Sequence, residues 1–238
     1  MESTANPRTF GLVAGLGVGA AMFYYKALVD AHLARGLSPR LLMVHADVRY
    51  VMSKAAARET KELAEYLAGL LTQLALGGAE LATIPAFSPQ VCAAELAAIA
   101  PLPLVSLLDA ISAAVEMKRF SRVALFGARV TMDTQLFGRL SGKEVIMPTP
   151  DEVDLISNTY LRVIDERRAS DEDFNLLRTL AHTLIEREKL DGIVLAGTDL
   201  AFVFNPSNTD FPHVDGARVH VEAIMQQICP PTSFASHK

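Results

Sequence analysis

The stretch Leu190-Asp-Gly-Ile-Val-Leu-Ala-Gly-Thr-Asp199 indicates both the fold and the position of a functional site. Residues 193–195 are an apolar run that is bounded by turn residues and too short for a helix, which predicts a buried strand. The strand leads through two small residues to the hydroxyl of Thr198 and the carboxylate of Asp199. Because ligands in open α/β sheets bind beyond the carboxyl ends of strands, we expect a binding site here.

A second stretch, Gly78-Ala-Glu-Leu-Ala-Thr-Ile-Pro85, repeats this form earlier in the chain. It is again a short apolar segment entered through glycine, and it is followed at residues 86–89 by Ala-Phe-Ser-Pro. Serine is a favoured N-cap and proline suits the first helical position, so Ser88 and Pro89 are predicted to begin a helix. Two matched strand ends suggest two halves of one site.

The composition favours a protein that binds a small molecule. The chain has 238 residues, 50% of them hydrophobic, and a net charge of -5, so it lacks the basic character that nucleic-acid binding requires. Cys92 and Cys229 are too few for a disulfide framework or a metal cluster and favour a reducing compartment. The apolar stretch 93–115 contains charges and prolines that do not suit a membrane span. We expect a cytoplasmic homo-oligomer, with a dimer favoured, and no nucleic-acid, membrane, metal or cofactor partner.

Strand-like apolar runs alternate with helical patterns along the chain, which predicts an α/β fold of mainly parallel sheets with helices on both faces. The clearest helix covers residues 58–76, where leucines recur at helical spacing. Further strands are expected at residues 10–14, 41–45, 104–106, 122–126 and 145–147. Further helices are expected from about 20 into the thirties and at 89–99, 108–117, 133–140, 153–167, 174–188 and 217–228.

The order of these elements repeats along the chain. The loop glycines Gly15 and Gly127 are 127 − 15 = 112 positions apart, and Ala86 and Gly197 are 197 − 86 = 111 positions apart. This near-constant offset predicts two pseudosymmetric lobes with a ligand cleft between them, lined by the loops at the strand ends.

The offset also predicts where the two halves begin and end. The first α/β half covers residues 9–117 and the second covers 118–228, while residues 1–8 and 229–238 are expected to be flexible tails. We expect the last helix, 217–228, to pack back onto the first half.

Four sequence blocks occur in an order and at separations found in a known family. They are Gly11-Leu-Val-Ala-Gly-Leu-Gly-Val, Asp47-Val-Arg49, Gly127-Ala-Arg-Val-Thr131-Met and Val214-Asp-Gly-Ala-Arg-Val-His-Val-Glu-Ala. Over residues 9–228 they resemble the first strand and glycine loop, the Asp-Arg pair, the Gly-Thr-x-x-Thr loop and the closing helix of the aspartate/glutamate racemase superfamily. This cofactor-independent group also includes hydantoin racemases, maleate isomerases and arylmalonate decarboxylases. The resemblance implies a two-lobed α/β fold and a small carboxylate ligand.

The chain departs from this family at two positions. Members carry thiols in Pro-Cys-Asn-Thr and Gly-Cys-Thr-Glu, whereas Ala86 and Gly197 stand at these positions here. Neither residue can hold a proton, so the two-thiol mechanism is not expected, since each face of the α-carbon needs an acid/base group. We expect the lost thiols to leave extra volume and Phe87 to add an aromatic wall, which would suit a bulkier or aromatic acid.

The resemblance and the residue chemistry together suggest a ligand-binding set. Arg49 matches the position that binds the distal carboxylate in the family, and its guanidinium suits a carboxylate. Thr131 and the amides after Gly127 are predicted to form an anion nest, and the neighbouring Val130 is a further predicted substrate contact. Gly15 is placed in the loop after the first strand. Thr198 and Ser88 are candidate ligand contacts, although both residue types also serve as turn or helix caps.

Candidate acid/base groups are fewer. Asp199 stands where the family has glutamate and is the leading candidate, with His45 and Asp47 as weaker ones; capping is the alternative role for Asp199. Two ligands in His-x-Asp are too few for a zinc site. Cys92 is expected to be a buried apolar residue and His220 to be structural. A dinucleotide site at Gly15-x-Gly-x-x-Ala is disfavoured because Asp47 lies too far along the chain.

Three functional classes remain open. The first is an enzyme that uses Asp199 in a lyase, decarboxylase or hydrolase step. The second is a catalytically silent carboxylate-binding or regulatory protein. The third is a racemase or isomerase that uses other bases.

Overall fold

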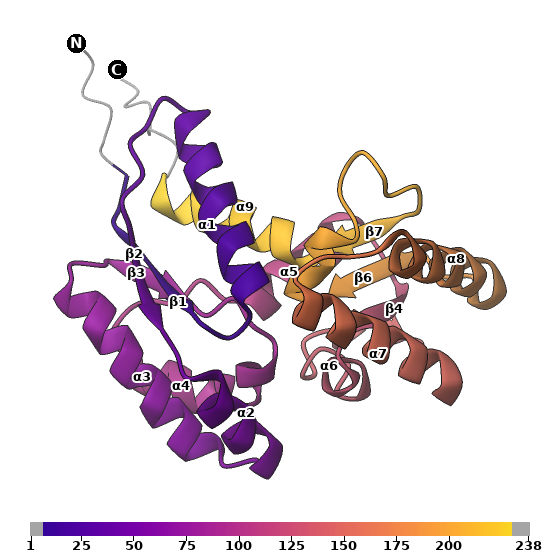
Figure 1. Cartoon of the computed structure of the whole chain (residues 1–238), viewed down its shortest axis with the longest axis horizontal. Coiled ribbons are helices and arrows are strands. Elements are labelled where there is room, and N and C mark those ends of the chain that lie inside the picture. The colour runs from indigo at the N-terminus through magenta and orange to yellow at the C-terminus, as the bar shows by residue number, and fades with distance from the viewer. Residues whose placement is uncertain (1–6, 230–238) are drawn as a thin grey trace.

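The computed structural model describes residues 7–229, which form two parallel β-sheets lying side by side with helices packed against them (Figure 1). The strands are β1 (Phe10–Ala14), β2 (Leu41–His45), β3 (Leu81–Thr83), β4 (Arg122–Gly127), β5 (Glu144–Val145), β6 (Gly192–Ala196) and β7 (His213–Asp215). The α-helices are α1 (Val18–Leu33), α2 (Val48–Ala57), α3 (Thr60–Leu76), α4 (Ala93–Ile99), α5 (Leu107–Met117), α6 (Arg129–Asp133), α7 (Pro150–Glu166), α8 (Asp171–Glu188) and α9 (Gly216–Ile228). The 3-10 helices η1 (Ser88–Cys92) and η2 (Thr198–Phe202) follow β3 and β6.

The two sheets repeat one topology. The first has the strand order β2-β1-β3 and the second has the order β5-β4-β6-β7, and all of these strand pairs are parallel. The first three strands of each sheet therefore occur in the same relative order. The predicted α/β class and the repetition of a parallel sheet are confirmed, and the carboxyl ends of β3 and β6 occupy equivalent positions.

The two sheets differ beyond these equivalent strands. The sequence analysis missed β7, which has three residues and pairs with β6. The corresponding strand expected at residues 104–106 is wrong, because Leu104 makes only an isolated parallel bridge to Ala82. Pro101 and Pro103 precede it and lack the N–H groups that a ladder requires. The strand expected at residues 145–147 is β5, which covers only Glu144–Val145.

Two predicted helices are divided in the structure. The helix expected at residues 58–76 begins at Thr60, and α2, which was not predicted, ends just before Arg58, whose φ of 55° breaks the helical path. The helix expected at 89–99 is the 3-10 helix η1 followed by α4. Local periodicity therefore located the apolar faces but not the breaks between helices.

The helix expected at residues 133–140 is wrong. The helix here is α6, which ends at Asp133. The next residues include Gln135, Leu136 and Phe137, whose φ values of 49°, 58° and 53° lie in the left-handed region. The buried Leu136 is inserted into the core from this turn rather than from a helical face.

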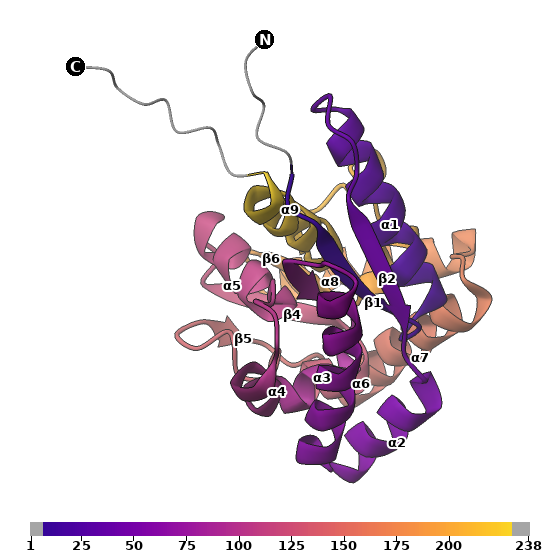
Figure 2. The same cartoon turned by 90° about the vertical axis from the view of Figure 1, so that its left-hand side faces the viewer.

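Each half of the chain contributes a helix to the core of the other half. The apolar face of α9, including Val221 and Ile224, packs with Phe10 of β1 in the first half. Figures 1 and 2 show α9 beside α1 and β1. Reciprocally, Ile111 of α5 packs into the core of the second sheet. The core of each lobe therefore includes a helix from the other half.

The predicted tails lie mostly outside the described residues, which exclude 1–6 and 230–238. Within the described part, the backbone N–H of Arg8 donates to the carbonyl of Ile228 at 3.2 Å. The two ends of the described chain therefore meet beside the first sheet.

Candidate functional site

Asp199 joins the two halves at the carboxyl end of β6. The residue is 3% exposed, and its Oδ1 accepts a hydrogen bond from the backbone N–H of Ala20 at 3.1 Å. Ala20 lies in the first turn of α1, whose N-cap, Gly17, has no side chain to supply such a bond. A carboxylate is stabilised at a helix N-terminus by free N–H groups and by the helix dipole. Asp199 therefore caps α1 from a position 179 residues away.

Burial makes the Asp199 carboxyl a group that can hold a proton near neutral pH. Desolvation raises its pKa to about 6, while the Ala20 N–H and the Thr198 hydroxyl oppose the rise. Oδ2 faces Thr198, with 3.5 Å between Oδ2 and Oγ1. A carboxyl with a pKa near the working pH is suited to both giving and taking a proton.

The close approach of α1 to Asp199 depends on a glycine. A Cβ added at Gly19 would lie 2.7 Å from Asp199 Oδ1 and 2.7 Å from the ring of Phe202. No alanine could occupy position 19 without displacing the carboxylate or η2. The glycine-rich loop thus makes room for a buried carboxylate from the other half of the chain. In other proteins such loops bind phosphate groups instead.

Tyr160 of α7 fills the space beside Gly197. A Cβ at Gly197 would lie 2.5 Å from Tyr160 Cε2, so any side chain at position 197 would collide with the ring. Burial raises the pKa of the Tyr160 phenol and the charge of Asp199 raises it further, whereas hydrogen bonds from the side chain and backbone of Thr198 and the backbone of Asp199 lower it. The expectation that loss of a thiol at position 197 leaves free volume is therefore wrong.

A buried hydrogen-bonded chain connects β3, α9 and α1. Burial lowers the pKa of His220 to about 4, so its ring is neutral at neutral pH. His220 Nε2 lies 3.0 Å from the carbonyl oxygen of Val105, which can only accept, so Nε2 carries the proton. Nδ1 must then accept from the Tyr24 hydroxyl at 2.9 Å. Thr83 Oγ1 also donates to the Val105 carbonyl. The structural role expected for His220 agrees with this arrangement.

The carboxyl end of β3 is less polar than that of β6. Ala86 and Phe87 are buried, and Phe87 packs into the core of the second half. Ser88 is the first residue of η1 and is only half-buried, but Phe87 is the N-cap and no side chain caps this helix. The predicted N-cap role of Ser88 is wrong. Gln90 braces the turn instead, because its Nε2 donates to the Ala86 carbonyl at 2.8 Å.

Thr131 and Val130 point to different environments. Thr131 is fully buried in α6, and its Oγ1 has no hydrogen-bond partner. An unpaired buried hydroxyl is unfavourable, which makes it a candidate contact for a ligand. Val130 is 38% exposed and lines a separate hollow with Arg58 and Phe137. The two neighbouring residues therefore do not face a single pocket.

His45, Asp47 and Arg49 form an exposed group at the end of β2. Asp47 Oδ1 accepts from the backbone N–H groups of Arg49 and Tyr50, so this carboxylate caps α2. Gly15 lies beside the group with φ of 92°, and a Cβ there would lie 2.5 Å from the Ala46 carbonyl oxygen. This exposed group therefore lies at the carboxyl end of β2, whereas Asp199, Thr198 and Tyr160 are buried.

The sequence analysis missed Tyr160, Tyr24 and Ala20. Tyr160 and Tyr24 occupy apolar faces of amphipathic helices, where a tyrosine has no feature that distinguishes it from a core residue. The Ala20 contact is made by backbone and joins residues far apart in the chain. Only the glycine-rich loop before α1 hinted at a close approach.

Comparison with known proteins places the chain in a family. The sequence profile of Asp/Glu/Hydantoin racemase matches residues 13–224. A Yersinia pestis protein described as a proposed Asp/Glu racemase is 21% identical, with a TM-score of 0.79 over 91% of this chain and 97% of its own. An aspartate racemase homologue from Pyrococcus horikoshii OT3 is 18% identical, with a TM-score of 0.77 over 92% of this chain and 98% of its own. Unliganded arylmalonate decarboxylase is 13% identical, with a TM-score of 0.54 over 94% of each chain.

The chain therefore belongs to the Asp/Glu/hydantoin racemase family, as the resemblance of its sequence blocks indicated. The solved structures share its two-lobed α/β fold. No curated protein sequence matches it. Within residues 7–229, no helix is long and apolar enough to cross a membrane.

Proposed function

We propose that the protein binds a small carboxylate between its two lobes and catalyses a proton transfer in which Asp199 replaces the family's thiols. The observation that carries the proposal is the Asp199 carboxyl, which is buried at the junction of the halves with a pKa raised to about 6. Superfamily relatives include racemases and a decarboxylase, which supports an enzyme of this general kind.

The chemistry assigned to Asp199 follows from its two oxygens. Oδ1 is held by the Ala20 N–H, which leaves Oδ2, beside the Thr198 hydroxyl, to carry the proton. In a decarboxylation, the bond from the α-carbon to the departing carboxylate breaks, carbon dioxide leaves, and the electron pair remains on the substrate as an enolate. Asp199 then protonates that carbon and regains its proton from water. A lyase step would begin with Asp199 as the base instead.

Binding is assigned to groups on both sides of the junction. The unpaired hydroxyl of buried Thr131 and the hydroxyl of Thr198 are the proposed interior contacts. Arg49 and Ser88 are the proposed outer contacts, since a guanidinium can bind a carboxylate in a bidentate way. His45 and Asp47 are proposed as auxiliary proton carriers, although Asp47 also caps α2.

The test is turnover of a defined acid panel by the full chain. Phenylmalonate and malonate are assayed for carbon dioxide release, and aspartate, glutamate and phenylglycine for deuterium uptake at the α-carbon in heavy water. Asp199→Asn keeps an oxygen that can accept the Ala20 N–H but cannot hold a transferable proton. We expect it to reduce turnover by at least about 100-fold, the usual contribution of a general acid or base.

The matched control is Asp133→Asn, which removes an exposed carboxylate from α6. It should leave turnover unchanged. Equal activity of wild type and Asp199→Asn on any acid in the panel would contradict the role of Asp199. Deuterium uptake that survives Asp199→Asn would favour a racemase or isomerase that uses other bases.

One observation favours a second function, that of a silent carboxylate-binding protein. The Tyr160 ring occupies the space that a side chain at position 197 would need, and the residues around it are buried. With no room for an acid/base side chain at position 197, a ligand bound at the junction would have no group there to take or return a proton. Saturable binding of an acid with no conversion by wild-type protein would support this alternative.

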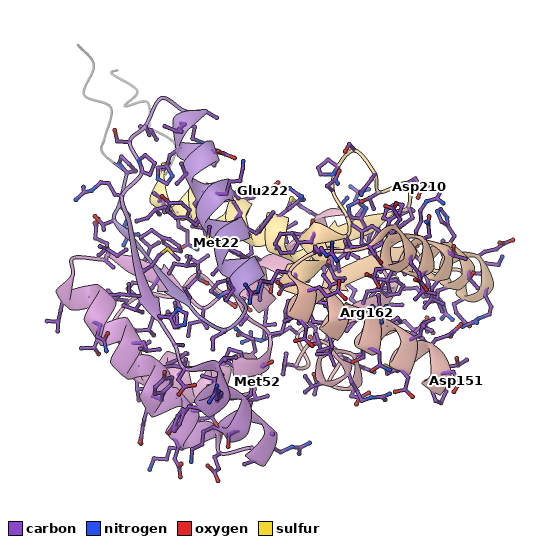
Figure 3. All side chains as sticks on the ribbon, in the orientation of Figure 1. Met22, Met52, Asp151, Arg162, Asp210 and Glu222 are labelled. Atoms are coloured by element: carbon purple, nitrogen blue, oxygen red, sulfur yellow. The ribbon has the colours of Figure 1, made fainter. Side chains whose placement is uncertain are left out.

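Self-association remains a prediction. Val18, Met22 and Tyr25 are exposed on α1, and Met22 is marked in Figure 3. Light scattering on the purified chain would test whether it forms the expected dimer.

A further inference from the structure

A cavity of about 480 Å³ lies between α4 and the start of α5. Leu96 and Ala97 of α4 form one wall, and the segment 100–107 forms much of the rest, so alanine, leucine, proline and valine side chains dominate the lining. A volume of this size and a mainly apolar lining are typical of small-molecule sites. Neither Asp199 nor Tyr160 lines this cavity.

Polar side chains in the cavity wall provide a point of recognition. Arg139, from the second half of the chain, lines the cavity together with Asp109 of α5. Its Nη1 donates to Asp109 Oδ1 at 2.9 Å, and both side chains are largely exposed. A guanidinium has five N–H groups, so Arg139 retains donors for a second partner. Because Asp109 offsets the single charge of Arg139, a ligand carboxylate would be bound here by the remaining N–H donors and not by net positive charge, which disfavours a dianion.

The inner wall is fixed by its own hydrogen bonds. Gln90 uses Nε2 to bind the Ala86 carbonyl, and Thr83 Oγ1 donates to the Val105 carbonyl at 2.8 Å. The cavity is lined by three of the residues in these hydrogen bonds: Thr83, Gln90 and Val105. The wall thus consists of internally bonded polar groups and apolar side chains, which a hydrocarbon body can contact without leaving polar groups newly unpaired.

We propose that this cavity is a second ligand site and that it binds a compact amphipathic monocarboxylate. The apolar body of the ligand lies against Leu96 and the proline-containing segment 100–107. Its carboxylate binds the free N–H groups of Arg139. This site is separate from the proton-transfer site, so each can be tested without the other.

The probe is octanoate, with octanamide as a neutral probe of the same length. Octanoate binding to the full chain is measured by isothermal titration calorimetry and by saturation-transfer NMR. Ala97→Trp is the variant that fills the cavity, since Ala97 lies on its wall and is exposed enough to accept a large side chain. Ala98→Trp, on the same helix but not on the cavity wall, is the matched control.

We expect wild type and Ala98→Trp to bind octanoate equally and Ala97→Trp to bind it at least about tenfold more weakly, or about 1.4 kcal/mol. Arg139→Gln should weaken octanoate binding and leave octanamide binding unchanged. Absence of octanoate binding at millimolar concentration, or an equal loss in Ala97→Trp and Ala98→Trp, would overturn the site. Unchanged octanoate binding in Arg139→Gln would overturn the assigned carboxylate contact.

Discussion

The carboxyl ends of β3 and β6 occupy equivalent places in two sheets of the same topology, yet they carry different chemistry. At the end of β6, Asp199 is buried with a raised pKa, and Tyr160 packs over Gly197. At the end of β3, Ala86 and Phe87 are apolar. The two strand ends therefore share one backbone arrangement but differ in chemistry, with Asp199 at the end of β6 and apolar Ala86 and Phe87 at the end of β3.

This difference bears on mechanism. A reaction that removes a proton from one face of a carbon and returns it to the other needs an acid/base group on each face. Asp199 can serve one face, but Ala86 offers nothing on the opposite side. The asymmetry supports one-sided proton transfer, as in a decarboxylation, over the symmetrical mechanism that a repeated fold would suit.

The largest expected effect is the loss of stability when the Tyr160 ring, which packs beside Gly197 at the end of β6, is removed. Tyr160→Ala should lower the free energy of unfolding by about 3–5 kcal/mol, because it removes a buried aromatic ring and leaves a cavity. Urea denaturation measures the loss. Tyr25→Ala, at an exposed position on α1, is the control and should cost less than about 1 kcal/mol. Similar losses in the two variants would mean that Tyr160 does not pack as described.

The sequence predicted the sheets well because their strands are short apolar runs bounded by turn residues. The central strands β1, β4 and β6 lie where the pattern placed them. Asp199 and Thr198 were also identified as candidates, since polar groups after a strand can be recognised locally. Tyr160 could not be identified, because its position over Gly197 depends on how α7 packs on the second sheet. The breaks at Arg58 and at residues 135–137 depend on left-handed backbone angles that periodicity does not encode.

The next effect concerns the pH dependence of stability. The folded-state pKa of Asp199 is raised from 3.8 to about 6. The protonated Asp199 carboxyl therefore contributes to the free energy of unfolding in full below pH 3.8, and this contribution is lost as the pH rises through about 6. Relative to Asp199→Asn, wild type should lose about 2 kcal/mol of stability between pH 4 and 7, because most of the rise in pKa, at about 1.36 kcal/mol per pKa unit, is expressed in this range. Urea denaturation at several pH values measures the difference.

His220 contributes with the opposite sign, since its lowered pKa makes stability fall as the pH drops from about 6.5 through about 4. This contribution is common to wild type and to Asp199→Asn, so it cancels in their difference. Asp133→Asn should follow the wild-type curve. A pH-independent difference between wild type and Asp199→Asn would show that Asp199 has an ordinary pKa.

A smaller effect is the loss of stability when a serine is placed at each of the two strand ends. Gly197→Ser places a Cβ against the Tyr160 ring and should cost about 1–3 kcal/mol, as overpacking does. Ala86→Ser adds only a hydroxyl to an existing Cβ and should cost less. In the Tyr160→Ala background, the cost of Gly197→Ser should largely disappear. Equal costs at positions 86 and 197, or no relief by Tyr160→Ala, would argue against the difference in packing.

The smallest effect concerns the hydrogen-bonded chain behind the junction. Tyr24→Phe leaves buried Nδ1 of His220 without its donor and should lower stability by about 1–2 kcal/mol. Thr83→Val should cost less, because His220 still donates to the Val105 carbonyl. Thermal or urea unfolding of both variants gives the order. A larger loss for Thr83→Val would contradict the donor assignment at His220.

The most direct measurement is the titration of Asp199 itself. Carbon-13 NMR of the carboxyl signals in aspartate-labelled protein, assigned by comparison with Asp199→Asn, follows this group alone. A midpoint near pH 6 is the predicted result, because the buried carboxyl at the end of β6 holds its proton close to neutrality. A midpoint near the ordinary value of 3.8 would contradict the claim that Asp199 is the proton-holding group of the site.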